Sequence, residues 1–168
     1  STIAEVLCAA ASEASARIFD QAAADQRLQG MGTTLTGIFI HRDRAFIVHV
    51  GDSRAFLLRG GTARQLTNDH SWLNEQVQAG LLTEEEAAAS DLKHIITRSV
   101  GFERHVEADV LSVSVSPGDA FLLCSDGLCG YVSEPTMAQA LRDVTDPDAC
   151  TDRLIQLALR AGGPDNIT

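Results

Sequence analysis

Three aspartates in this sequence stand in the same kind of local context. Asp52 and Asp126 each come one residue after a short apolar run, and Asp165 follows the turn sequence Gly162-Gly163-Pro164. Small residues beside each aspartate allow the backbone to come close. Carboxylates that converge from the ends of different strands would form an oxygen-rich site for a hard divalent cation such as Mg²⁺ or Mn²⁺.

Each of these aspartates also has a simpler interpretation. Aspartate often caps a turn, because its side chain accepts hydrogen bonds from nearby backbone amides. The spacing of the three residues does not show that their carboxylates converge. A metal site and three separate turn caps therefore both remain open at this point.

Histidines and arginines supply further candidates for chemistry. His94 could act as a general acid, because an imidazole titrates near neutral pH. His70 follows Asn68-Asp69 and is more typical of a residue that hydrogen-bonds within a turn. Arg98 and Arg104 could contact a phosphorylated peptide, but both are more typical of solvated surface arginines.

The elements that position these residues follow from the periodicity of the sequence. From residue 1 to about residue 29, apolar residues recur at steps of three and four, which predicts one amphipathic helix. Short runs rich in β-branched and aromatic residues, separated by turn residues, then predict antiparallel strands. These runs are 33–40, 45–50, 55–58, 62–66, 106–115 and 120–124.

Two short helices are expected between the fourth and fifth strands. The first would end at Gly80, and the second would begin with a capping box formed by Thr83 and Glu86. An insertion of this kind projects from a sheet, so we expect a substrate flap at about residues 70–98. Later helices are predicted from Ser133 and from Asp146-Pro147 to about Ala161, because proline is favoured in a first helical turn.

The grouping of these elements predicts the fold class. Helices and antiparallel strands lie in separate blocks, which indicates an α+β layered domain instead of repeated βαβ units. The length of 168 residues suits one compact domain with a buried core. Helices before and after the strands could cover opposite faces of the sheets.

Composition excludes several classes of partner. Thirteen basic and 23 acidic residues give a formal charge of −10, which disfavours binding to nucleic acid or to anionic lipid. No apolar run reaches the roughly 18 residues of a membrane span, and no signal peptide is visible. The four cysteines form no C-x-x-C pair, which indicates reduced thiols and a cytoplasmic protein.

Five segments resemble the metal-dependent serine/threonine protein phosphatases of the type 2C-like (PPM) family from bacteria. They occur in the order and at the approximate separations found in that family, and the predicted flap falls where the family has its flap. The segments are Met31–Leu35, Gly51–Arg54, Leu66–His70, Leu123–Leu128 and Gly162–Thr168.

The resemblance implies a fold and an activity. The fold would be a four-layer α-β-β-α sandwich of antiparallel sheets. The activity would be hydrolysis of phosphoserine and phosphothreonine on proteins by a metal-activated water, opposed to Ser/Thr kinases in bacterial signalling. Two central Mg²⁺ or Mn²⁺ ions, and a possible third, would be the cofactors, and phosphorylated proteins and a cognate kinase system would be the partners.

The resemblance also implies roles for individual positions. The aspartates that match Asp126 and Asp165 share one metal of the binuclear centre in that family. The aspartate that matches Asp52 holds, together with Asp126, an additional and weaker metal. The position of His94 is implicated in substrate handling in some relatives.

The sequence departs from the family pattern at both ends. Family members begin with strands that carry an Arg…Asn-Glu-Asp segment and an Asp-Gly-Met-Gly-Gly segment, and neither is present here. The strand that follows the Gly162–Thr168 segment is also absent. We therefore expect these 168 residues alone to bind metal poorly and to be nearly inactive. The alternative is a non-catalytic scaffold or regulatory module of the same family.

Overall fold

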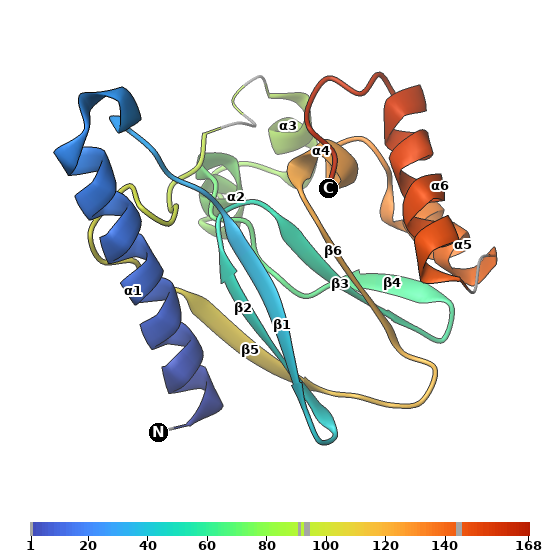
Figure 1. Ribbon diagram of the computed structural model, residues 1–168. Coiled ribbons are helices and arrows are strands. Elements are labelled where there is room, and N and C mark those ends of the chain that lie inside the picture. Colours follow the sequence, from blue (N-terminus) through green and yellow to red (C-terminus); the bar gives the residue numbers. More distant parts are fainter. Residues whose placement is uncertain (1, 91, 93–94, 144–145) are drawn as a thin grey trace. The chain divides into compact units, whose positions relative to one another are not determined.

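The strands expected from the sequence are all found in a computed structural model, which describes residues 2–90, 92, 95–143 and 146–168. Their bounds are β1 (Leu35–His41), β2 (Arg44–Val50), β3 (Arg54–Arg59), β4 (Thr62–Gln65), β5 (Asp109–Ser114) and β6 (Ala120–Cys124). Each strand pairs with its neighbours in the antiparallel sense, as predicted. Within the described residues they form two three-stranded sheets, ordered β1-β2-β5 and β4-β3-β6 (Figure 1).

The two sheets belong to two different units of the chain. The first unit comprises residues 1–52 and 68–114, and the second comprises residues 53–67 and 115–168. The chain therefore leaves the first unit after Asp52, builds the β3–β4 hairpin of the second, and returns. Within the described residues, no helix combines the length and the hydropathy needed to cross a membrane.

In the first unit, helix α1 (Ile3–Ala24) packs against β2 and β5. Thr2 and Glu5 form a capping box at its start, in which each side chain accepts a hydrogen bond from the other's backbone N–H. The core under this helix is made of small and β-branched residues. Its buried members are Ala11, Val48, Val50, Val100, Val106 and Ala108.

Helix α1 is shorter than predicted. It ends at Ala24 instead of near residue 29, because Asp25 takes an extended conformation. The Asp25 carboxylate then accepts a hydrogen bond from the backbone N–H of Arg27, which starts the short 3₁₀ helix η1 (Gln26–Leu28). Side-chain competition of this kind for backbone donors is the usual reason that aspartate ends a helix.

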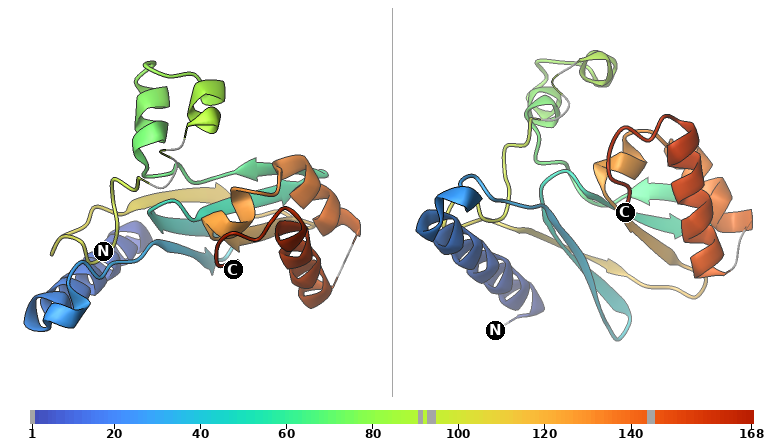
Figure 2. Two further views of the ribbon diagram at one scale, coloured as in Figure 1. Left: turned by 90° about the horizontal axis from the view of Figure 1, so that it is seen from above. Right: turned by 45° about the horizontal axis from the view of Figure 1, so that its top comes forward.

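Two short helices come after β4 in the sequence, as predicted, and they belong to the first unit. They are α2 (Trp72–Gln78), capped by Ser71, and α3 (Glu84–Ala89), which begins with the expected Thr83–Glu86 capping box. Figure 2 shows this helical pair standing away from the strands of its own unit. We call residues 70–98 the flap; its role toward a substrate stays a prediction.

The second unit buries a larger apolar core between its sheet and three helices. The helices are α4 (Asp126–Cys129), α5 (Glu134–Asp143) and α6 (Pro147–Arg160). Phe56 and Met137 are each 1% exposed in this core, where burial of one such side chain contributes about 1.5–3 kcal/mol. Asp146 caps α6 by accepting a hydrogen bond from the backbone N–H of Ala149, as the Asp146-Pro147 pair predicts.

Ser15 links α1 to the loop after the flap and yields a prediction about stability. It is fully buried, and its hydroxyl donates to the Glu103 carbonyl (2.7 Å) and accepts from the Gly101 N–H (2.8 Å). Ser15→Ala should lower the free energy of unfolding by about 1–3 kcal/mol, because the Glu103 carbonyl and the Gly101 N–H lose their hydrogen-bond partner. The measurement is urea unfolding, with Gln21→Ala on the exposed surface of the same helix as the control. Equal losses in the two variants would contradict this account.

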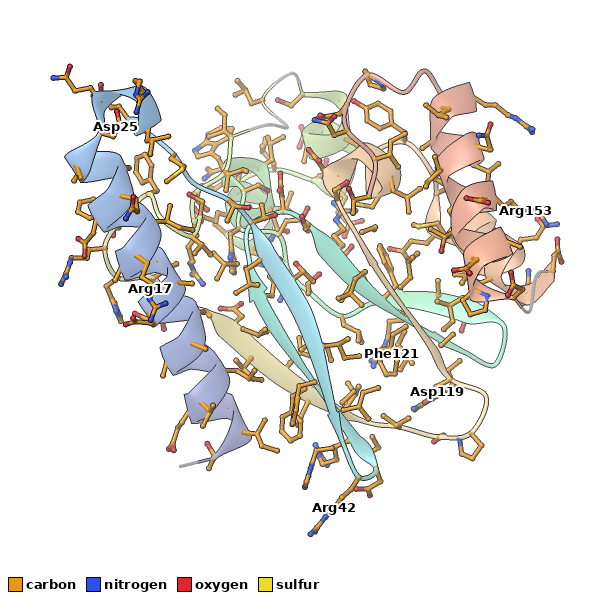
Figure 3. The ribbon with its side chains drawn as sticks, viewed as in Figure 1. Arg17, Asp25, Arg42, Asp119, Phe121 and Arg153 are labelled. Atoms are coloured by element: carbon orange, nitrogen blue, oxygen red, sulfur yellow. The ribbon has the colours of Figure 1, made fainter. Side chains whose placement is uncertain are left out.

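The ion pair between Arg59 and Asp119 predicts acid sensitivity of the second unit. Both Asp119 oxygens accept from the Arg59 guanidinium, at 2.8 and 2.7 Å. Figure 3 shows Asp119 beside the turn that leads into β6. These bonds, with a further one from the Ser116 N–H, lower the pKa of Asp119 from 3.8 to about 2. Because the folded-state pKa is lowered, the pair stabilises the fold above about pH 4 and this contribution disappears as the pH falls toward 2.

The variant Asp119→Asn tests this dependence. Its deficit in melting temperature relative to the unaltered protein should be present at pH 7 and should shrink between pH 4 and pH 2. Arg59→Met should show the same narrowing, since it removes the other partner. A deficit that stays constant over this pH range would show that the ion pair does not cause the acid sensitivity.

Candidate metal centre

Asp126 lies where β6 gives way to the short helix α4. Ser125 takes the extended conformation of an N-cap, and Asp126 is the first residue of the helix. The next two residues, Gly127 and Leu128, are buried, whereas Asp126 itself is half-buried. The local sequence therefore anchors the backbone on the apolar side and leaves the carboxylate near the surface.

Asp165 lies in the segment after α6, which runs past α4 (Figure 1). Two hydrogen bonds join this segment to Ser125. The Ser125 N–H donates to the Thr168 carbonyl (3.1 Å), and the Ser125 hydroxyl accepts from the Thr168 N–H (3.2 Å). The same hydroxyl lies 3.3 Å from the Asn166 carbonyl oxygen. Asp126 directly follows Ser125, and Asp165 directly precedes Asn166. The two aspartates are therefore each next to a residue that takes part in this contact.

Gly127 makes this approach possible. A Cβ atom at this position would lie 2.1 Å from the Asn166 carbonyl oxygen, a distance that excludes any side chain. The Asp165 carboxylate is fixed in its turn, because Oδ1 accepts a hydrogen bond from the Asn166 N–H (2.7 Å). Two of the three predicted ligands are therefore carried by adjoining segments of the second unit.

The donor set of these two residues suits a hard cation. Mg²⁺ commonly binds through one or two carboxylates and keeps several water ligands, so two carboxylates are suitable members of its ligand set. In the part of the chain that the structure describes, no group of three or more His, Cys, Asp or Glu side chains is arranged to hold a metal ion. Asp126 and Asp165 fit a divalent cation as a partial ligand set.

Asp52 belongs to the first unit, at the end of β2 and directly after Gly51. Gly51 has a φ of +111°, and a Cβ there would lie 2.4 Å from Cγ2 of Thr34. Only glycine fits this position, as the small residue beside Asp52 suggested. That Asp52 converges with Asp126 and Asp165 stays a prediction.

His70 is buried, and instead of bonding within its own turn it bonds to Gly51, 19 residues earlier in the sequence. Its backbone N–H donates to the Gly51 carbonyl (2.7 Å), and its ring Nδ1 accepts from the Gly51 N–H (3.1 Å). Its Nε2 faces Asp109 Oδ2 at 3.2 Å. Burial alone would raise the pKa of Asp109, but the hydrogen bonds from His70 and Arg98 and the positive charge of Arg98 outweigh it and lower that pKa.

The two arginines considered for phosphopeptide contact are both paired within the protein. Arg98 donates to Asp109 Oδ1 (2.9 Å) and to the Glu107 carbonyl (3.0 Å). Arg104 pairs with Asp20 at the exposed surface of α1, at 3.1 Å. His94, the other candidate for substrate handling, lies outside the described residues.

His49 is fully buried in β2 and was not among the residues predicted from the sequence to matter for function. Its Nε2 donates to the Asn68 carbonyl (3.0 Å), its Nδ1 bonds the Thr36 hydroxyl (3.0 Å), and its ring lies 4.8 Å from that of His70. Burial is the main cause that lowers the pKa of His49 below its ordinary value. The available signal was a histidine at an inward position of an otherwise apolar strand.

Comparison with known families decides the relationship of the chain. The sequence profile of the family described as "Protein phosphatase 2C" matches residues 1–159. The chain belongs to the protein phosphatase 2C family. Its resemblance to the type 2C-like phosphatases, inferred above from five short segments, is confirmed.

Two bacterial relatives illustrate the similarity within the 2C family. The chain is 44% identical to the serine/threonine protein phosphatase PstP of Mycobacterium tuberculosis over 142 residues, which are 84% of this chain and 27% of PstP. It is 43% identical to the protein phosphatase PhpP of Streptococcus pneumoniae over 148 residues, 86% of this chain and 58% of PhpP. The chain thus spans between about a quarter and three fifths of these relatives.

Solved structures of 2C-family phosphatases confirm the fold class. The serine/threonine phosphatase of S. agalactiae superposes with a TM-score of 0.92 and 37% identity, covering 99% of this chain and 70% of that one. The catalytic domain of PstP, solved in complex with two manganese ions, gives a TM-score of 0.81 and 40% identity over 91% of this chain and 63% of that one. The predicted α+β fold of antiparallel sheets and helices is therefore correct.

The close approach at Gly127 predicts the effect of adding one methyl group in this 2C-family chain. Gly127→Ala should force residues 166–168 away from α4 and lower the free energy of unfolding by about 1–3 kcal/mol, as overpacking does. Hydrogen exchange at the Ser125 and Thr168 amides should accelerate as well. Gly37→Ala is the matched control, because its new Cβ would meet only Cγ1 of Val48, at 3.3 Å. Unchanged exchange at both amides in Gly127→Ala would contradict the close approach.

Proposed function

We propose that the protein to which this chain belongs hydrolyses phosphoserine and phosphothreonine on proteins, with a divalent cation held by Asp126 and Asp165. The observation that carries the proposal is the hydrogen bonding of Ser125 to Thr168, which keeps the two aspartate-bearing segments together. Membership of the protein phosphatase 2C family supports the reaction class. The relatives PstP and PhpP are both named as protein phosphatases.

Mg²⁺ or Mn²⁺ is the proposed cofactor. The PstP catalytic domain was solved with two manganese ions, which supports this choice, and carboxylate oxygens are the ligands that such hard cations prefer. When bound, the cation lowers the pKa of coordinated water and offsets the charge of phosphoryl oxygens. Asp52 is proposed as a ligand of a further, weaker cation.

The residues of this chain would act mainly by orientation. Asp126 and Asp165 hold the cation, while Ser125 and Gly127 fix the backbone from which those carboxylates project. The hydrogen bond from the Asn166 N–H to Asp165 Oδ1 restricts the rotation of that carboxylate. Pre-set ligands of this kind lower the reorganisation needed when phosphate binds. None of the serines is required as a nucleophile in this scheme.

The flap and His94 are proposed to interact with the protein substrate. His94 would act as a general acid, for which an imidazole is suited near neutral pH. Phosphorylated proteins are the proposed substrates, with a cognate Ser/Thr kinase as the opposing activity in bacterial signalling. We propose a cytoplasmic site of action, supported by four free cysteines. Residues 1–168 would together form part of one catalytic domain.

A phosphatase assay with metal-ligand variants tests this function. The intact protein that contains this chain should release phosphate from a phosphothreonine peptide in the presence of Mn²⁺, and chelation by EDTA should stop the release. Asp126→Asn and Asp165→Asn should each lower kcat/KM by at least about 100-fold, since even the loss of a group that only orients a ligand costs about 10- to 100-fold. Asp152→Asn, on the exposed surface of α6, is the matched control.

Two results would decide against the proposal. Absence of phosphate release with either Mg²⁺ or Mn²⁺ would favour the alternative of a non-catalytic scaffold or regulatory module. Phosphate release that is unaffected by Asp126→Asn would show that the cation is held elsewhere. Folding of every variant should be checked by circular dichroism, so that lost activity is not mistaken for lost structure.

A further inference from the structure

Gly51 precedes the proposed ligand Asp52. Because glycine has no side chain, only contacts with its backbone can hold it in place. It is buried, its φ of +111° is open only to glycine, and Thr34 leaves no space for a side chain. Glycine is also the residue with the widest conformational freedom. Something outside Gly51 must therefore restrict it if the Asp52 carboxylate is to keep one position.

His70 restricts both polar groups of the Gly51 backbone. The His70 N–H donates to the Gly51 carbonyl at 2.7 Å, and the Gly51 N–H donates to His70 Nδ1 at 3.1 Å. Two hydrogen bonds between one pair of residues fix orientation as well as distance. His70 is only 7% exposed, so water has little access to compete for these bonds.

The rest of the His70 ring is fixed by groups behind it. Because Nδ1 accepts the Gly51 N–H, the ring hydrogen is on Nε2, and it donates to Asp109 Oδ2 at 3.2 Å. Asp109 is in turn held by Arg98, whose Nη1 donates to its Oδ1 at 2.9 Å. Arg98 Nη1 also lies 3.2 Å from His70 Nε2, but both atoms are donors, so their link runs through Asp109.

The same residue stands at the base of the flap. The His70 carbonyl accepts a hydrogen bond from the Thr97 N–H (2.9 Å), and the Asp69 carbonyl accepts from the Asn74 side chain in α2 (2.7 Å). The two ends of the flap are thereby tied to His70 and its neighbour. Among the hydrogen bonds described, the one from the Gly51 N–H to His70 Nδ1 is the bond in which a side chain at the base of the flap holds the backbone next to Asp52.

We infer that His70 is a positioning residue for Asp52: it clamps the Gly51 backbone from the base of the flap and so sets where the Asp52 carboxylate meets a cation. The inference rests on the proposed function, in which Asp52 is a cation ligand. It assigns His70 a role beyond that of a residue that hydrogen-bonds within a turn.

Two substitutions separate the two ring nitrogens of His70. In asparagine, Oδ1 lies near the former position of Nδ1 and can accept the Gly51 N–H, while the bond to Asp109 is lost. In glutamine, the terminal NH₂ lies near the former position of Nε2 and can donate to Asp109, while the Gly51 acceptor is lost. His70→Asn and His70→Gln each remove one hydrogen bond, so they form a matched pair for stability.

The experiment uses the intact protein and Mg²⁺ as the probe. Titration followed by NMR at the Gly51 and Ser53 amides reports cation binding beside Asp52 without need of activity. His70→Gln should weaken this binding by about 10- to 100-fold and speed exchange of the Gly51 amide, the range found when a group that orients a metal ligand is lost. His70→Asn should stay within about threefold of the unaltered protein, and melting temperatures of the two variants should be similar.

A second measurement needs no variant and covers the case in which one does not fold. In the unaltered protein, a ¹⁵N–¹⁵N coupling across the hydrogen bond should join the Gly51 amide to His70 Nδ1. Its absence overturns the inference, as does an equal effect of the two variants on Mg²⁺ binding, or no shift of either amide by Mg²⁺ in the unaltered protein. Failure of the proposed function is a different result, namely no phosphate release by a protein that still shows the coupling and the Mg²⁺ shifts.

Discussion

The candidate metal centre depends on the close approach of two backbone segments at Gly127. The Asn166 carbonyl occupies the space where a Cβ would lie, and Ser125 supplies the hydrogen bonds that join the segments. Apolar burial also holds these two segments together, since Leu128 is buried in the core of the second unit and Ile167 packs against that core. Each carboxylate is thus two residues from an apolar anchor. The position of Asp126 relative to Asp165 follows from backbone contacts and core packing, and it needs no direct contact between the two carboxylates.

The same physical solution recurs at Asp52 in the first unit. A glycine that admits no side chain precedes the aspartate, and a polar side chain from a distant part of the sequence satisfies the glycine backbone. The His70 ring holds the Gly51 backbone beside Asp52, and the Ser125 hydroxyl holds the Thr168 backbone beside Asp126. A carboxylate that is to bind a cation cannot also be held by strong ion pairs, because those pairs would have to break on binding. Fixing the neighbouring backbone restricts where the carboxylate can lie.

Much of the fold could be predicted from the sequence, because local patterns determine local structure. The run of β-branched and aromatic residues at 45–50 and the capping pair Thr83–Glu86 needed no distant information. Helix α4 was missed because four residues are too few to show a helical period. The network around His70 was also missed, since it depends on the pairing of β2 with β5, which sets His49 opposite Asp109 across 60 residues of sequence. For the site, the residue types suggested a cation, but the nearness of Asp126 to Asp165 was indicated only by the family resemblance.

The distribution of charge explains why bound cations are better suited than arginines to bind the phosphorylated substrate of such a protein. The chain has a formal charge of −10, and a phosphorylated peptide adds further negative charge. Arg98, Arg104 and Arg59 are engaged with Asp109, Asp20 and Asp119, so part of the positive charge already stabilises the fold. Withdrawing these arginines to bind phosphate would leave carboxylates without partners. Divalent cations avoid this conflict, because they bring positive charge from solution to carboxylates such as Asp126 and Asp165. An acidic surface around such a site also raises the local concentration of the cations themselves.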